Sequence, residues 1–264
     1  MTFRSLAIVM PAFNEAEGLP GFLHEILDAV RPLADQVHLV VVDDCSTDDT
    51  VAVLETQMQS MPELSVHRSA VNRSHGPTAL AAYRAGLGFE PDALVHVDGD
   101  GQFVGADFPR VLRALEGDGV QVVHGVRTGR TDPWFRRALT ACVGAGVALV
   151  AGGRIPDVNT PLRAYRPDAL RALLERCPAD AAVPHVHFSI AEAHKKFRRR
   201  YIRVRSIPRR GTSASGTMWG AVRKPTLPPR RLISFSLAAA REVWLYSVLP
   251  GGAGRARRTH AAGA

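Results

Sequence analysis

Short apolar runs that end in polar loops are the feature that most limits how this chain can fold. Three of them, 6–10, 37–42 and 93–97, lie within the first hundred residues. Each has the length of a buried strand, and the segment 18–31 carries apolar residues at helical spacing. Strands that alternate with helices form βαβ units, and these units build a parallel sheet. The sequence therefore predicts an α/β fold in which helices cover both faces of a mostly parallel sheet.

Polar residues follow each of these predicted strands. Pro-Ala-Phe-Asn-Glu (11–15) follows the first, Asp43 and Asp44 follow the second, and Asp98 to Gln102 follow the third. Because ligands of such sheets bind beyond the carboxyl ends of the strands, we expect the three groups to converge on one site. The first of these turns lacks GxGxxG, and the sequence holds no GxxxxGK[ST], so neither an NAD site nor a P-loop is indicated.

Asp98 and Asp100 are separated by one glycine, which permits a sharp turn that aims both carboxylates into one space. Two carboxylates at close range repel each other unless a cation lies between them, and such oxygen ligands suit Mg²⁺ or Mn²⁺. Gln102 offers a neutral oxygen to the same ion. A plain polar turn is the alternative, since Asp and Gly are common in turns. The expected convergence of three polar groups favours the metal site.

The composition suits one elaborated α/β domain with an anionic partner. The chain has 264 residues, 46% of them hydrophobic, and a formal net charge of +8. Lipid head groups, nucleotides and nucleic acid are the anionic partners that this charge favours. Three widely spaced cysteines without a CxxC pair fit a reducing compartment. Since a strand begins near Met1 and no apolar run reaches about 20 residues, we expect neither a signal peptide nor a transmembrane helix.

Six segments, taken in order, resemble family 2 glycosyltransferases of the GT-A fold, most closely the dolichol- and polyprenol-phosphate mannose synthase branch. The resemblance covers roughly residues 5–215 and implies a Rossmann-like catalytic domain with a mostly parallel sheet. The sequence departs from the family pattern at Ser74 and Pro161, where glycine is usual. The six segments are PAFNE (11–15), VVDDCSTDDT (41–50), VNRSHG (71–76), VDGDGQ (97–102), GVRTGR (125–130) and DVNTPLRAYR (157–166).

The resemblance implies a nucleotide-sugar site and a metal site that share residues. The matching residues that line the nucleotide sugar are Pro11, Phe13, Glu15, Val42, Asp44, Asp98, Gly99 and Asp100. The matching ligands for Mg²⁺ or Mn²⁺ are Asp98, Asp100 and Gln102. Asp98, Asp100 and Arg127 are the predicted catalytic residues, since Arg127 matches an arginine near the donor and acceptor phosphates.

The resemblance also implies an acceptor site for a lipid phosphate. Arg136 and Thr140, one helical turn apart, match an Arg/Ser pair that holds this phosphate. Arg209 and Arg210 loosely resemble a segment that closes over the donor phosphates, and they are also predicted, with Arg136 and Thr140, to bind the acceptor phosphate.

The expected reaction is metal-dependent, inverting transfer of a sugar from a GDP- or UDP-sugar to a polyprenyl (dolichyl-type) phosphate. Such an acceptor is already ionised at neutral pH, so it needs no strong general base. The alternative is transfer to a saccharide or another hydroxyl acceptor, for which Asp157 is the candidate base. A non-catalytic basic module that binds membrane or nucleic acid is a third hypothesis. The complete set of Asp98, Asp100 and Gln102 argues against this third hypothesis.

The remaining chain divides by composition. We expect a catalytic domain over 1–220, a basic amphipathic helix over 221–250 and a disordered tail over 251–264. Basic and aromatic residues over 195–210 favour an anionic membrane surface as partner rather than nucleic acid. The glycine-rich apolar segment 139–153 is expected to form a packed helix, with a groove for a prenyl tail as the alternative. A cytoplasmic location is expected, with peripheral contact to the inner face of the plasma membrane as a further hypothesis.

Overall fold

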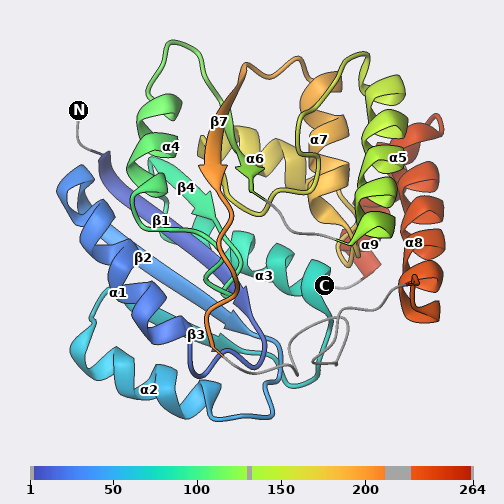
Figure 1. The fold of residues 1–264 in the computed structure, drawn as a ribbon. Coiled ribbons are helices and arrows are strands. Elements are labelled where there is room, and N and C mark those ends of the chain that lie inside the picture. Colours follow the sequence, from blue (N-terminus) through green and yellow to red (C-terminus); the bar gives the residue numbers. More distant parts are fainter. Residues whose placement is uncertain (1–2, 130–132, 212–226, 263–264) are drawn as a thin grey trace.

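The structure, a computed structural model, describes residues 3–129, 133–211 and 227–262 (Figure 1). Within these residues one sheet of seven strands forms the centre, in the order β3-β2-β1-β4-β6-β5-β7. The strands are β1 (Phe3–Ala12), β2 (Ala34–Asp43), β3 (Leu64–Arg68), β4 (Ala93–His96), β5 (Val122–Thr128), β6 (Arg163–Tyr165) and β7 (Arg199–Arg205).

The pairing of the strands confirms a mostly parallel sheet. β1 pairs in parallel with β2 and β4, and β5 pairs in parallel with β7. The short strand β6 lies between β4 and β5 and is antiparallel to both. This inserted strand brings the segment before Arg163 to the same edge of the sheet as the carboxyl ends of β4 and β5.

Alternate residues of β1 pack into two different cores, as the period of two along a strand requires. Leu6, Ile8 and Met10 belong to one core, and Ala7 and Val9 belong to the other. Helices on the first face are α1 (Leu19–Val30), α2 (Thr50–Ser60) and α4 (Asp107–Leu115), and helices on the second are α3 (His75–Leu87), α6 (Pro167–Leu174) and α7 (Pro184–His194). Helices therefore cover both faces of the sheet, as expected.

Two further helices lie outside this sandwich, next to α7 (Figure 1). They are α5 (Trp134–Ala151) and α8 (Arg230–Val243), which continues into the π-helical turn Trp244–Val248. By length and composition alone α5 could cross a membrane, which was not expected of any segment from the sequence, and only 11% of it is buried. The expectation of a packed helix over 139–153 is therefore wrong for most of its surface. The sequence shows that these side chains are small and apolar, but it does not show whether they face other parts of the protein or the surface.

The segment expected to be a disordered tail contains the helix α9 (Gly252–Ala262). Specific contacts hold it against the rest of the chain. The Arg255 guanidinium donates hydrogen bonds to the carbonyls of Leu245 and Leu249, and Thr259 Oγ1 accepts one from the backbone N of Ala179 at 3.0 Å. These tertiary contacts offset the weak helix propensity of a segment rich in glycine.

Candidate active site

The three polar groups predicted to converge do so at the carboxyl ends of β1, β2 and β4. The backbone N of Gly99 donates to the carbonyl of Pro11 at 3.1 Å, and the backbone N of Asp44 donates to the carbonyl of Ala12 at 2.9 Å. Gly99 has no room for a side chain, because a Cβ there would lie 2.9 Å from the Pro11 oxygen. The loop 98–102 is therefore locked against the loop 11–15.

Glu15, Asp98 and Asp100 form an acidic cluster, in which neighbouring charges act on Glu15 and Asp100. Burial raises the pKa of Asp100 from 3.8 to about 6, and the charge of Asp98 adds to this effect. Burial also raises the pKa of Glu15 from 4.5 to about 7, a change that Arg209 opposes and that both aspartates reinforce. The cluster therefore holds more negative charge than its surroundings readily stabilise.

A divalent cation fits this cluster. Asp98 Oδ1 is buried without an aligned hydrogen-bond donor among the described residues, although His75 Nε2 lies 3.5 Å away. Gln102 lies beside it, and its backbone N donates to Asp100 Oδ1 at 3.2 Å. Over the described ranges, no group of three or more His, Cys, Asp or Glu side chains is arranged so that it could hold a metal ion. A cation here would therefore complete its coordination with water or with oxygens of a substrate.

The segment that follows β7 crosses the 98–102 loop and brings two arginines to the acidic cluster. The backbone N of Ile207 donates to the Gln102 carbonyl at 3.0 Å. Arg209 Nη2 lies 2.6 Å from Glu15 Oε1. Arg210 donates to the carbonyls of Gly101 and Phe103, at 3.1 Å each. Arg209 thus offsets part of the negative charge of the acidic cluster, while Arg210 lies against the backbone of residues 101–103 and pairs with Glu25.

An open pocket of about 500 Å³ lies at the carboxyl ends of β2 and β3, and none of Glu15, Asp98 and Asp100 lines it. Val42, predicted to contact the nucleotide, lines it, and Asp44 lies beside it, with Oδ1 accepting from the backbone N of Arg73 at 2.7 Å. Volumes of this size are typical of small-molecule sites. The other polar residues that line the pocket are His67, Arg68, Ser69 and Arg73, and none of them was nominated from the sequence. Ser69 and Arg73 follow β3, so the rule that ligands bind beyond the carboxyl ends of strands would have found these two.

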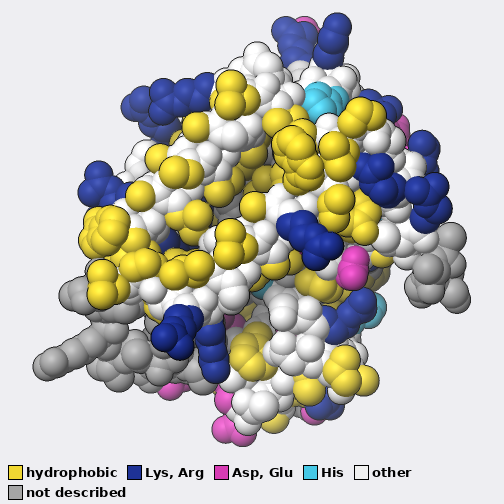
Figure 2. Space-filling model, turned by 90° about the vertical axis from the view of Figure 1, so that its right-hand side faces the viewer, with side chains coloured by type: hydrophobic (Ala, Val, Ile, Leu, Met, Phe, Trp, Pro, Cys, Tyr) yellow, Lys and Arg dark blue, Asp and Glu magenta, His cyan; other side chains and the backbone are white. Residues whose placement is uncertain are grey.

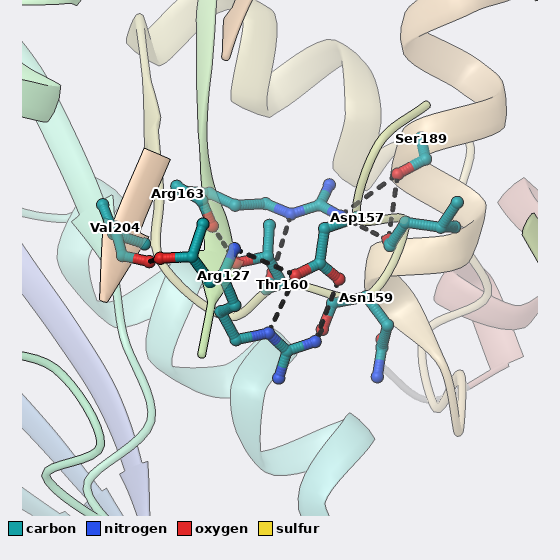
Figure 3. A network of polar contacts seen from close by, with 10 residues as sticks. Arg127, Asp157, Asn159, Thr160, Arg163, Ser189 and Val204 are labelled. Atoms are coloured by element: carbon teal, nitrogen blue, oxygen red, sulfur yellow. Dashed lines mark hydrogen bonds and ion pairs between the residues drawn. The ribbon is translucent and has the colours of Figure 1, made fainter. Parts of the chain in front are cut away.

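Arg127 lies at the end of β5 and forms a two-pronged ion pair with Asp157 (Figure 3). Its Nε is 2.8 Å from Asp157 Oδ2, and its Nη2 is 2.9 Å from Asp157 Oδ1. The same Nη2 donates to the carbonyl of Asn159 at 3.2 Å. Because both oxygens of Asp157 accept from Arg127, the candidate base for a hydroxyl acceptor is engaged in this conformation. The sequence nominated both residues and did not predict that they pair.

The predicted acceptor residues Arg136 and Thr140 lie one turn apart on α5, near its amino-terminal end. α5 packs against α7, a helix on the second face of the sheet, and not on the strands that hold the acidic cluster. Arg136 is half-buried and Thr140 is exposed.

The two departures from the family pattern have different backbone consequences. Ser74 has φ of 72° and ψ of 164°, a region that glycine adopts easily and other residues rarely do. Pro161 does not have a positive φ. Its carbonyl accepts a hydrogen bond from His96 Nδ1 at 2.8 Å, so proline is compatible with the local structure. Ser74 therefore stores strain, while Pro161 does not.

A model of the family described as glycosyl transferase family 2 matches residues 7–174. Among curated proteins, the undecaprenyl-phosphate 4-deoxy-4-formamido-L-arabinose transferase of Serratia proteamaculans is 30% identical over 172 residues, which is 65% of this chain and 52% of that protein. The transferase of the same name from Sodalis glossinidius is 31% identical over 175 residues, which is 66% of this chain and 52% of that protein. The chain thus spans about half the length of these relatives.

Among solved structures, the glucosyl-3-phosphoglycerate synthase of Mycobacterium tuberculosis in complex with Mn²⁺ and uridine-diphosphate-glucose shares the fold. Its TM-score is 0.59 at 19% identity, over 94% of this chain and 80% of that one. The likeness confirms the fold class expected from the sequence.

Proposed function

Because the chain belongs to glycosyl transferase family 2, we propose that it transfers a sugar from a nucleotide sugar to a polyprenyl phosphate. The observation that carries this proposal is the acidic cluster of Glu15, Asp98 and Asp100, which the strand ends bring together from loops far apart in the sequence. The acceptor class rests on two relatives whose names state transfer to undecaprenyl phosphate.

In the donor half of the site, the pocket would bind the nucleotide base and the loop 98–102 would bind the metal ion. Val42 and Asp44 border the pocket that would take the base, and Pro11, Phe13, Glu15 and Gly99 belong to the loops beside it. Asp98, Asp100 and Gln102 would hold Mg²⁺ or Mn²⁺, which supplies Lewis-acid stabilisation of a leaving diphosphate. A solved protein of the same fold was crystallised with Mn²⁺ and UDP-glucose, which favours a UDP-sugar over a GDP-sugar as donor.

The chemical step is a direct displacement with inversion at the anomeric carbon. An acceptor phosphate oxygen forms the new bond to this carbon, and the bond to the nucleoside diphosphate breaks with its electron pair leaving on the diphosphate. Arg209 and Arg210 would stabilise that added charge once Arg209 turns from Glu15, and Arg210 from Glu25, toward the ligand. An ionised phosphate needs no base, which fits the engagement of both Asp157 oxygens by Arg127.

The proposed binding site for the acceptor phosphate consists of Arg127, Arg136 and Thr140. An arginine presents several donors in one plane and can bind phosphate oxygens in pairs, so it suits recognition of a phosphomonoester. Thr140 adds a hydroxyl one helical turn from Arg136.

We further propose that the protein docks peripherally on the cytoplasmic face of an anionic membrane through α5 and α8. Figure 2 shows hydrophobic side chains gathered on this side of the molecule, with Lys and Arg around them. A surface of this kind suits the interface between acyl chains and anionic head groups. The large exposed hydrophobic residues on it are Trp134, Val143, Leu149, Ile233, Phe235, Leu237 and Trp244.

The test is a product analysis with purified protein, Mn²⁺, a short prenyl phosphate and a panel of UDP- and GDP-sugars. The expected result is a lipid product whose mass equals prenyl phosphate plus one sugar, from one nucleotide class. Asp100→Asn protein and a chelator serve as controls and should abolish it. Hydrolysis of donors without any lipid product would contradict the proposed acceptor.

A further inference from the structure

Arg163 is a fully buried cation at the centre of the fold. It lies on β6 with no exposed surface and is the largest of the fully buried side chains in the described part of the chain. A guanidinium leaves water at a high free-energy cost unless it is paired and hydrogen-bonded. Its ionic partner is Glu192 of α7, with Nη1 at 3.4 Å from Oε1. Glu192 also contacts His124 of β5, with Oε2 at 2.9 Å from Nε2.

Two further groups of Arg163, Nε and Nη2, donate to carbonyls of the loop 157–160 (Figure 3). Its Nε donates to the carbonyl of Thr160 at 3.0 Å, and its Nη2 donates to the carbonyl of Val158 at 2.6 Å. Ser189 of α7 links the two groups, since its Oγ accepts from Arg163 Nη2 at 3.1 Å and donates to the Val158 carbonyl at 3.2 Å. A buried charge is therefore used to hold the backbone of residues 157–160.

The same loop presents Asp157 to Arg127. Thr160 Oγ1 fastens the loop to β5 by donating to the Gly125 carbonyl at 2.5 Å. Between the two tethered carbonyls, Asn159 offers its own carbonyl to Arg127 Nη2 at 3.2 Å. The orientation of the Arg127 guanidinium thus follows from a loop whose shape Arg163 sets from behind.

We propose that Arg163 is a positioning residue, which fixes the 157–160 loop so that Asp157 aims Arg127 at the acceptor phosphate. Arg163 itself contacts no substrate, because the loop lies between it and Arg127. This inference rests on the proposed function for the role of Arg127, and on the contacts of Arg163 for everything else.

The first test is kinetic. Arg163→Lys keeps the charge and loses the planar set of donors, and Arg166→Lys is the matched control on the same segment. Arg166 donates instead to the carbonyl of Leu115, away from the loop. The expected loss in kcat/KM for prenyl phosphate is about 10- to 100-fold in Arg163→Lys, as for other partners that orient a ligand-binding residue. Donor affinity, measured by calorimetry, should stay unchanged in both variants.

A double-mutant cycle separates positioning from a general loss of structure. If Arg163 acts through Asp157, Arg163→Lys should cause no further loss of kcat/KM in an Asp157→Asn background. Losses that multiply, or a weaker donor affinity, would overturn the positioning role. Ser189→Ala removes a single contact to the loop and repeats the cycle if Arg163→Lys protein does not fold.

Hydrogen exchange tests, without any measurement of sugar transfer, whether Arg163 holds the 157–160 loop. The backbone N of Thr160 donates to the Asp157 carbonyl at 3.3 Å, and that of Gly125 donates to the Leu162 carbonyl at 2.8 Å. Both amides should exchange faster in Arg163→Lys, while amides of β1 keep their protection. Unchanged exchange at both would overturn the inference. Wild-type protein that transfers no sugar to prenyl phosphate would instead refute the proposed function, and the exchange result would still stand for Arg163.

Discussion

Replacing Asp100 by Asn should stabilise the metal-free protein while removing its response to metal. In the folded, metal-free protein the pKa of Asp100 is about 6 and that of Glu15 is about 7, each above its ordinary value. The folded form therefore binds more protons than the unfolded chain between about pH 4 and pH 7. The free energy of unfolding falls as pH rises through this interval, and the loss is complete above about pH 7.

The size of the effect follows from the pKa of Asp100. A rise of about two pKa units corresponds to at most about 3 kcal/mol. Because Asp100 is partly exposed, solvent screening reduces the expected figure to about 1–2 kcal/mol. In a chain of this size 1 kcal/mol shifts Tm by about 2–4 °C, so Asp100→Asn should raise the Tm of metal-free protein at pH 8 by about 2–8 °C. At pH 5 the difference should nearly vanish, because the carboxyl is then mostly protonated.

Calorimetric melting at pH 5 and pH 8, with and without Mn²⁺, measures both parts of this prediction. Wild-type Tm should rise with Mn²⁺ more at pH 8 than at pH 5, and the Asn variant should not respond. Asp49→Asn is the control, since Asp49 is exposed in a neighbouring loop and should melt like wild type. A less stable metal-free Asn variant at pH 8, or a wild-type response to Mn²⁺ in that variant, would refute the reasoning.

Three further predictions concern the acceptor, the membrane surface and the strained backbone. Arg136→Ala should weaken use of prenyl phosphate about ten- to a hundredfold, from one or two charged hydrogen bonds of about 1.5–3 kcal/mol, with donor affinity unchanged in calorimetry. Arg136→Lys should recover part of the loss, and a loss of donor affinity would move Arg136 to the diphosphate. Leu149→Glu with Leu237→Glu should reduce flotation with anionic liposomes, and equal flotation with neutral and anionic vesicles would contradict an electrostatic contribution. Ser74→Gly should raise the free energy of unfolding by about 1 kcal/mol in denaturant titration, because glycine relieves its positive φ, and a fall would contradict the strain.

The arrangement of the donor side could be predicted because its signals are local. An apolar run and the polar loop that follows it are close in the sequence, so Asp98, Asp44 and Glu15 could each be assigned to the loop at a strand end. The rule for parallel sheets then brings the three together without any knowledge of tertiary contacts. The structure reproduces this convergence through the backbone contacts of Gly99 and Asp44.

The support behind Arg127 could not be predicted, because it depends on residues far apart in the sequence. β6 has only three residues. From the sequence alone, Arg163 would be assigned to the surface, because its buried partners Glu192 and Ser189 are known only from the fold. No spacing in the sequence links these positions. Arg127 and Asp157, 30 residues apart, were likewise nominated singly, and only the antiparallel strand between β4 and β5 brings them together.

The outer helices show a different limit of sequence interpretation. The apolar residues of α5 predicted a helix correctly, while hydropathy alone does not distinguish a face that packs on protein from one that meets lipid. Leu149 is 86% exposed, and in the sequence it resembles Val147, which is 4% exposed. The direction of a helix face follows from the neighbours that the fold supplies, and here α7 covers only one side of α5.

Competition between acceptors in one reaction tests the central claim most directly. Purified protein with Mn²⁺ and its preferred labelled nucleotide sugar would be offered equal concentrations of a prenyl phosphate, the corresponding prenyl alcohol and 3-phosphoglycerate. The account predicts label in the prenyl phosphosugar alone, because an ionised phosphate needs no base and both oxygens of Asp157 are held by Arg127. Label on the alcohol or on the glycerate hydroxyl, with none on the lipid phosphate, would contradict it.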